Sequence, residues 1–145
     1  MIHILILCSL MLGCLSVRSQ IPDAIRKIEY TTLTRGYQKH VVISPDSITT
    51  KVEGRGEDQS HKRALTKGEW SMLIDCLRNI KLAEIPDLKS PSMKRAYDGA
   101  LHSTLTLTTK DEKVLSHSFD NEDANEKLLP LMKGVKKLEG DGDKE

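Results

Sequence analysis

The residues best equipped for chemistry gather in one stretch of the chain, MKRAYDGALHST. This stretch holds a guanidinium (Arg95), a phenol (Tyr97), a carboxylate (Asp98) and an imidazole (His102), and a second carboxylate, Asp120, is predicted at the same end of the hairpin that follows. Two carboxylates beside an arginine can bind a cation or a basic partner, and with a histidine they can support acid–base hydrolysis. We take Arg95, Tyr97, Asp98 and Asp120 as candidate binding residues.

The same side chains also have a purely structural interpretation. Asp98 and Gly99 form a favourable turn pair ahead of a strand, Asp120 or Asp123 can cap the final helix, and Arg95 can pair with one of these carboxylates. The sequence favours this structural role over a binding site and a binding site over catalysis. No catalytic residue is therefore assigned.

The other reactive side chains indicate neither a nucleophile nor a metal site. Cys76 is expected within a helix beside Asp75, whose charge opposes thiolate formation, and is interpreted as a small buried hydrophobe. The histidines beyond the first twenty residues are His40, His61, His102 and His117. None of them has the i, i+4 spacing of a zinc pair on a helix. Since phosphate-binding and dinucleotide-binding glycine motifs are also missing from the sequence, we expect neither a metal nor a cofactor.

The composition argues against several classes of partner. The chain of 145 residues has 22 basic and 21 acidic residues, so it lacks the strong positive field that nucleic-acid binding requires. Aromatic residues make up only 3% of the chain, too few for the stacking platforms that hold single strands or sugars. We therefore expect a protein or a small ligand as the partner, and no nucleic acid.

The N-terminal segment 1–19 is interpreted as a signal peptide. Ile2–Leu15 is an apolar run too short to span a bilayer, and small side chains precede an expected cleavage site after Ser19. An alternative is a bacterial lipobox, LMLGC, in which Cys14 becomes the lipidated first residue, and a retained anchor is a third reading. The sequence thus predicts an exported protein, periplasmic or secreted, that contacts the membrane only if Cys14 is lipidated.

The chain from 25 to 52 alternates apolar and polar residues, which predicts three half-buried strands joined by two tight turns. The turns are Arg35-Gly36 and Pro45-Asp46. They align the apolar residues in pairs on one face: Tyr30 with Val41, Ile28 with Ile43, and Ile43 with Ile48.

A charged, glycine-containing segment, 53–64, is predicted to be a solvated loop, and a helix begins directly after it. Thr66 is the expected N-cap, and Glu69 completes a capping box. The apolar stripe of this helix runs from Trp70 to Ile80 and is predicted to pack on the sheet.

The connection 83–99 is longer than most loops of compact domains and is therefore the expected contact surface. Two strands follow it, over 100–109 and 114–119. Their hydrophobic match favours a register in which Leu105 lies opposite Phe119. This register puts His117 on the packed face and His102 on the other, so the two histidines cannot share a metal.

The last element is a helix that begins near Asn125, where Pro130 indicates either a later start or a kink. The predicted fold class is α+β: an antiparallel five-stranded sheet in βββ-α-ββ-α order with both helices packed on one face. We expect a single domain over 20–139 and a flexible acidic tail over 140–145.

Four segments of the chain carry a resemblance: TRGYQKHVVIS, LTKGEW, IPDLKSPSMKRAYDGA and SFD. Together they resemble a family of small exported proteins and lipoproteins of Gram-negative bacteria, and the similarity covers most of the chain after the leader. The sequence departs from the family at NEDANEK, where family members are richer in proline. Because the family has no known activity, the resemblance implies an envelope location and transfers no catalytic residue.

Taken together, these features predict an exported, non-enzymatic binding or interaction module of the bacterial cell envelope. Two alternatives stay open. One is a small hydrolase or metal-dependent enzyme that uses Asp98, His102 and Asp120. The other is a protease-inhibitor-like protein in which the 83–99 loop occupies the cleft of its target.

Overall fold

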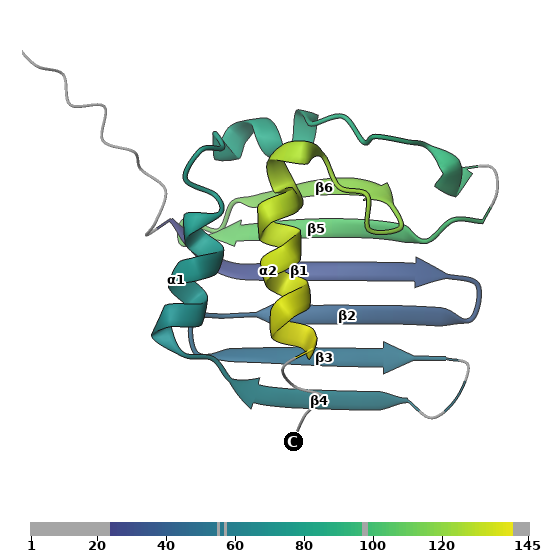
Figure 1. Ribbon diagram of the computed structural model, residues 1–145, viewed down its shortest axis with the longest axis horizontal. Helices are drawn as coiled ribbons and strands as arrows, with labels where there is room; N and C mark the ends of the chain where they lie inside the picture. Colours follow the sequence, from purple (N-terminus) through teal and green to yellow (C-terminus); the bar gives the residue numbers. More distant parts are fainter. Residues whose placement is uncertain (1–23, 55, 57, 97–98, 141–145) are drawn as a thin grey trace, which may run out of the picture.

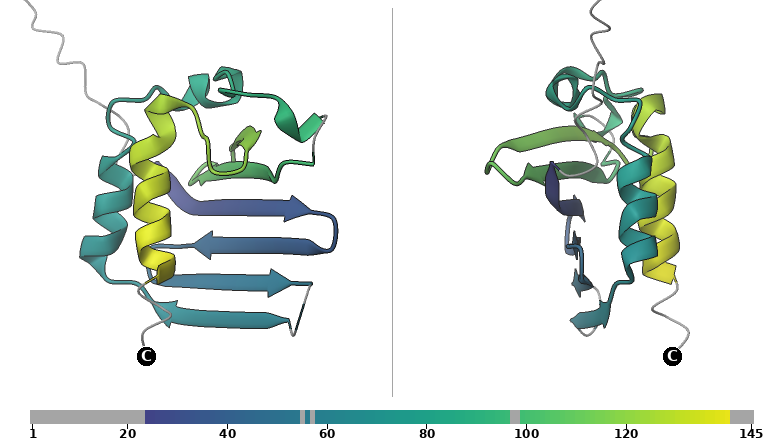
Figure 2. Two further views of the ribbon diagram at one scale, coloured as in Figure 1. Left: turned by 45° about the vertical axis from the view of Figure 1, so that its right-hand side comes forward. Right: turned by 90° about the vertical axis from the view of Figure 1, so that its left-hand side faces the viewer.

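The computed structural model describes residues 24–54, 56, 58–96 and 99–140. These residues form an α+β fold with a six-stranded antiparallel sheet in the order β4-β3-β2-β1-β5-β6 (Figure 1). Both α-helices lie on one side of the sheet, and no helix of the described residues lies on the opposite face, as the right-hand view of Figure 2 shows. The α+β class is thus confirmed, whereas the predicted five-stranded order is wrong.

The first three strands form the predicted meander. They are β1 (Ile25–Thr34), β2 (Tyr37–Ile43) and β3 (Ser47–Glu53). Each predicted cross-strand pair is present: Ile28 with Ile43, Tyr30 with Val41, and Ile43 with Ile48. Gly36 closes the first turn with a φ of +68°, a conformation that glycine adopts without steric cost. Turn chemistry and alternation were sufficient here because each pairing is local in sequence.

The segment 53–64, predicted to be a solvated loop, contains a strand instead. β4 (Gln59–Ala64) pairs with β3 and forms one edge of the sheet. Its side chains are almost all exposed. An edge strand with two solvated faces shows no hydrophobic alternation, and this is why the sequence pattern does not reveal it.

The last hairpin consists of β5 (His102–Thr109) and β6 (Val114–Asp120), and β5 joins it to β1 at the centre of the sheet. The predicted pairing of Leu105 with Phe119 is wrong. Leu105 lies opposite His117, so the register differs by two residues from the predicted one. A shift of two keeps every side chain on its face, and hydrophobic pattern alone therefore cannot distinguish the two registers.

The first helix, α1 (Lys67–Asp75), begins at the predicted capping box. The backbone N–H of Glu69 donates to Thr66 Oγ1 at 3.2 Å, and the backbone N–H of Thr66 donates to Glu69 Oε2 at 2.7 Å. The helix is shorter than predicted because it ends at Asp75. Leu77 and Ile80 are nevertheless buried, in the turns that follow the helix.

The second helix, α2 (Leu129–Gly140), follows a short 3₁₀ turn, η3 (Glu126–Leu128). The side chain of Asn125 accepts a hydrogen bond from the backbone N–H of Lys127 at 3.1 Å and so caps the start. Pro130 lies in the first turn of α2, where a backbone N–H would have no helical partner. The later start is therefore the correct one of the two predicted explanations.

The core lies between the helices and the sheet. Its fully buried side chains come from both layers and include Tyr30, Leu73, Leu105, Leu107, Phe119 and Leu131. The rings of Tyr30 and Phe119 stack with their centroids 6.4 Å apart. Neither of the helices in the described ranges is both long enough and apolar enough to cross a membrane.

The connection between α1 and β5 contains two 3₁₀ turns, η1 (Leu82–Asp87) and η2 (Lys94–Ala96). Both turns contact β6, and Ile85 of η1 is fully buried (Figure 1). The connection therefore runs along the β6 side of the sheet as part of the scaffold. It carries Arg95, one of the predicted binding residues, whereas Asp120 lies at the end of β6.

Candidate functional site

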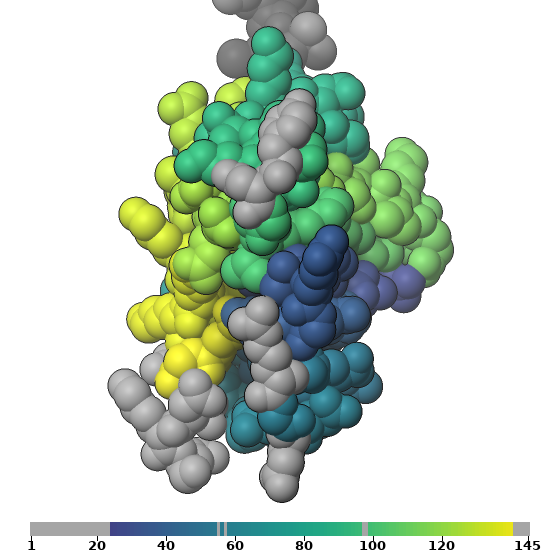
Figure 3. Space-filling view, turned by 90° about the vertical axis from the view of Figure 1, so that its right-hand side faces the viewer, coloured from purple at the N-terminus to yellow at the C-terminus, as the bar shows by residue number. Residues whose placement is uncertain are grey.

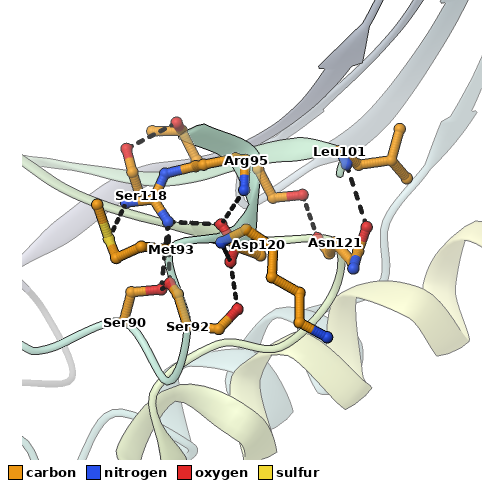
Figure 4. A network of polar contacts seen from close by, with 11 residues as sticks. Ser90, Ser92, Met93, Arg95, Leu101, Ser118, Asp120 and Asn121 are labelled. Atoms are coloured by element: carbon orange, nitrogen blue, oxygen red, sulfur yellow. Dashed lines mark hydrogen bonds and ion pairs between the residues drawn. The ribbon is translucent and has the colours of Figure 1, made fainter. Parts of the chain in front are cut away.

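Two of the predicted binding residues, Arg95 and Asp120, meet at the end of β6 (Figure 4). Arg95 Nη1 donates to Asp120 Oδ1 at 2.6 Å, and the Asp120 side chain is fully buried. The turn η2 brings Arg95 to this position because it folds the connection against β6. The other two predicted residues, Tyr97 and Asp98, lie outside the described residues.

The Asp120 carboxylate is saturated with hydrogen-bond donors. Its Oδ2 accepts from the Ser92 hydroxyl and from the backbone N–H of Lys94 at 2.5 Å. Its Oδ1 accepts from the backbone N–H of Arg95 at 3.3 Å as well as from the Arg95 guanidinium. An ionised carboxylate offers roughly four acceptor positions, so this group has none left for a cation or a substrate.

Hydrogen bonding also determines the charge of Asp120. Burial alone would raise the pKa of this carboxyl. The hydrogen bonds from the Ser92 hydroxyl, from the Arg95 side chain and from the backbone of Arg95 and Lys94 outweigh burial and hold the pKa well below its usual range. Asp120 therefore stays ionised and paired, whereas a general acid would need a pKa closer to neutrality.

Arg95 also bonds to the connection that carries it. Its Nη1 donates to the backbone oxygen of Ser92 at 3.2 Å, and its Nη2 lies 3.2 Å from Met93 Sδ (Figure 4). The turn after β6 is fixed in the same way, since the backbone N–H of Asn121 donates to the Leu101 oxygen at 2.8 Å. These contacts tie the connection and the start of β5 to the end of β6. The predicted pairing of Arg95 with a carboxylate is therefore present, whereas the predicted cap of the final helix by Asp120 or Asp123 is wrong, because Asn125 is the residue that caps it.

The two histidines of the last hairpin lie on opposite faces, as predicted. His102 is opposite Asp120 in the register, but the described donors to Asp120 belong to Ser92, Lys94 and Arg95. Among the described residues, none forms a hydrogen bond with Nε2 of either His102 or His117.

His117 is buried on the helix-covered face, where its ring stacks on Phe119 with centroids 5.8 Å apart. Burial, followed by the positive charge of Arg95, lowers its pKa. This imidazole is therefore neutral at pH 7 and belongs to the core.

Cys76 was expected within a helix, but it is the C-cap residue that follows the last residue of α1. Its thiol donates to the backbone oxygen of Met72 at 3.2 Å. Burial raises the pKa of the thiol, and the charge of Asp75 raises it further, so the reactive thiolate is disfavoured. In the described ranges, no three histidine, cysteine or acidic side chains group closely enough to hold a metal ion.

A second site, which the sequence analysis missed, is a groove of about 360 Å³ between α2 and the strands β2 to β4. Figure 3 looks toward this end of the molecule, with α2 in yellow on one side and the strands in blue and teal on the other. The lining side chains come from three strands, from α2 and from the turn after β6: Lys39, Thr50, Val52, Gln59, His61, Glu122, Lys136 and Glu139.

The groove contains paired charges. Lys39 Nζ lies 2.8 Å from Glu139 Oε1 and 5.5 Å from the centre of the Tyr30 ring, and Lys136 forms an ion pair with Glu122. Burial alone would lower the pKa of Lys39, but the hydrogen bond and charge of Glu139 outweigh burial and raise it. The α2 side of the groove thus carries charges that are compensated within the protein, and side chains of β3 and β4 complete the lining.

The sequence analysis missed this groove because its floor includes β4, which was predicted to be a loop. One signal was nevertheless present. In the confirmed register, Lys39 falls on the same face as Val41 and Ile43, which pack in the core. A lysine in that alternation indicates that the helices leave part of this face open to solvent.

Comparisons of the chain with protein-family models, with curated proteins and with solved structures gave no match. A function for this protein must therefore be derived from the geometry described above. The two sites differ in their access to a ligand. The polar groups of the Arg95–Asp120 cluster are already hydrogen-bonded within the protein, whereas the groove is open to solvent.

Proposed function

We propose that the protein is an exported, non-enzymatic binding module of the bacterial cell envelope that binds its partner at the groove beside α2. The observation that carries this proposal is the groove itself, an open hollow of about 360 Å³ that lies beside β4 and is lined mostly by polar side chains. The apolar leader and the resemblance to exported proteins support the location.

The state of Asp120 supports a non-enzymatic role. The hydrolase alternative needs Asp98, His102 and Asp120 to act on one substrate, but every acceptor position of the Asp120 carboxylate is filled by the scaffold. A carboxylate held in this way cannot exchange a proton or bind a metal without loosening the connection that it anchors.

The same hydrogen bonds reduce the case for the 83–99 loop as the contact surface. The loop is packed on β6 through Ile85 and tied to Asp120 through Arg95. An inhibitor-like loop must project into the cleft of its target, whereas the described turns of this loop, η1 and η2, pack against the edge strand β6 of its own sheet. The groove is the better candidate because its side chains are available to a partner.

The groove offers both donors and acceptors. Ammonium groups of Lys39 and Lys136 and the side chains of Gln59 and His61 can donate, and the oxygen atoms of Thr50 and the two glutamates can accept. Such a lining suits a polar ligand that brings several hydrogen-bonding groups, for example a polypeptide segment.

The location is tested by expressing the full chain in a Gram-negative host and measuring the N-terminus of the product by mass spectrometry. We expect an envelope protein that begins at Gln20, and a lipidated Cys14 would also support an envelope location. A cytoplasmic protein that retains Met1 would contradict it.

Binding at the groove is tested with a photo-crosslinking amino acid placed at position 59 or, as a control, at position 110 on the turn between β5 and β6. We expect a defined crosslinked partner in envelope preparations from position 59 only. Equal crosslinking at both positions, or none at position 59, would contradict a binding module that acts through the groove.

A further inference from the structure

We propose that the outer edge of β4 binds an extended segment of a partner protein as an additional strand, and that this segment carries acidic residues at alternate positions. The inference depends on the proposed function, because it specifies the class of partner that the binding module recognises. Strand addition to an exposed sheet edge is a common mode of peptide recognition.

The two edges of the sheet differ. β6 has η1 and η2 packed against it, whereas no described element packs against the outer side of β4. β4 is six residues long, and all but one of its residues are exposed. An edge of this length can accept another strand.

The backbone groups that face outward follow from the register. The N–H of Leu65 donates to the oxygen of Asp46 at 2.9 Å, so these two residues form a hydrogen-bonded pair at the start of the ladder between β3 and β4. Such pairs recur at every second residue of an antiparallel ladder. Gln59, His61 and Arg63 therefore bond to β3, and the N–H and C=O groups of Ser60, Lys62 and Ala64 point away from the sheet.

The charges near this edge favour an acidic partner. Lys62 and Arg63 are consecutive, and Lys51 lies opposite Ser60 on the same face as Lys62. Arg63 is already paired with Glu69 at 3.1 Å, but neither Lys51 nor Lys62 forms an ion pair with a described residue. A second copy of this strand would place like charges together, so a partner with acidic side chains opposite Lys62 is favoured over self-pairing.

The groove extends this surface toward α2. Gln59 and His61 lie on β4 and also line the groove, so the edge and the groove are continuous. In an added strand, the residues opposite Gln59 and His61 would point to the same side as the groove. Because Glu122 and Glu139 compensate the lysines there, these partner residues are expected to be polar and uncharged, in alternation with the acidic ones.

The test uses an acetylated and amidated peptide in which glutamate and threonine alternate, with its affinity for the mature protein measured by fluorescence anisotropy. We expect Ser60→Pro to weaken binding at least about tenfold, because it removes an outward N–H without removing a bond to β3. Ser60→Ala is the matched control and should bind normally. Lys62→Glu should weaken binding to a similar extent, whereas Lys110→Glu, far from β4 on the β5–β6 turn, should not.

Several outcomes would overturn the inference. These are no binding of the peptide, equal binding of a peptide with lysine in place of glutamate, or binding that Ser60→Pro leaves unchanged while thermal unfolding shows an intact fold. The crosslinking experiment separates this failure from that of the proposed function. A partner crosslinked from position 59 in both the Ser60→Pro variant and the unmodified protein would leave the binding module standing and exclude strand addition.

Discussion

At the scale of single residues, the buried ion pair between Arg95 and Asp120 holds the connection against the end of β6. The sequence suggests Asp120 and Arg95 as binding residues. In the structure, both side chains instead form their hydrogen bonds with each other and with the connection that crosses the end of β6. Removing one partner of a buried ion pair leaves the other charge uncompensated, which is strongly destabilising. A stability measurement can therefore distinguish a structural role of this pair from a binding role.

Replacing Asp120 with asparagine should lower the melting temperature by roughly 5 to 10 °C, because the amide cannot neutralise Arg95 or accept all of the present hydrogen bonds. Circular dichroism melts provide the measurement. Asp123→Asn is the control, since Asp123 is exposed and should melt within about 1 °C of the unmodified protein. If Asp120→Asn melted normally but lost its partner, the cluster would be a binding site after all.

His117 should make the stability depend on pH. Its folded-state pKa is lowered by burial and by Arg95, so the unfolded chain takes up a proton more readily than the folded one. The contribution of His117 is therefore fully present above the unfolded-state pKa of about 6.5 and is lost as the pH falls below that value. His117→Leu should flatten the fall in melting temperature between about pH 7 and pH 5. An unchanged slope in His117→Leu would show that other groups cause the acid sensitivity.

At the scale of elements, the sequence predicts correctly those features that depend on neighbouring residues. The capping box at Thr66 and the turn at Gly36 each depend on residues a few positions apart, and the structure has both. β4 and the register of the last hairpin depend on partners outside the segment. The polar sequence QSHKRA becomes a strand only because β3 offers a ladder to it, and a register shift of two is invisible to alternation. The groove was unpredictable for the same reason, since it needs β4 in place.

The packing of the two helices can be tested at two glycines. A Cβ atom on Gly134 of α2 would lie 2.8 Å from Cδ2 of Leu73, which is fully buried in α1 and cannot move into solvent. Gly134→Ala should therefore destabilise the protein by about 1 to 2 kcal/mol, since overpacking outweighs the gain in helix propensity. Gly68→Ala, in the open first turn of α1, should instead stabilise it by about 0.5 kcal/mol. Chemical denaturation of both variants gives the two signs, and stabilisation by Gly134→Ala would mean that the helices lie farther apart.

At the scale of the whole molecule, the fold treats its two sheet edges differently. The connection 82–96 packs against the β6 edge, and the Arg95–Asp120 ion pair holds it there. No element of the described ranges packs against the outer side of β4, which carries the basic side chain of Lys62. Sheet edges left open with basic side chains are protected from self-association yet accessible to a partner of opposite charge. The covered β6 edge thus contributes to stability, and the open β4 edge is the one proposed to bind a partner.

Removing the charge of Lys62 from the β4 edge should make the protein associate with itself. In the double variant Ser60→Val and Lys62→Val, the outward backbone groups of β4 remain while repulsion between copies falls and β-propensity rises. Sedimentation velocity should then show dimers or larger species at micromolar concentrations. Lys110→Val is the control, because Lys110 is also an exposed lysine but lies on the β5–β6 turn. A double variant that sediments like the unmodified protein would show that the β4 edge is blocked by something other than charge, and strand addition by a partner would then be blocked as well.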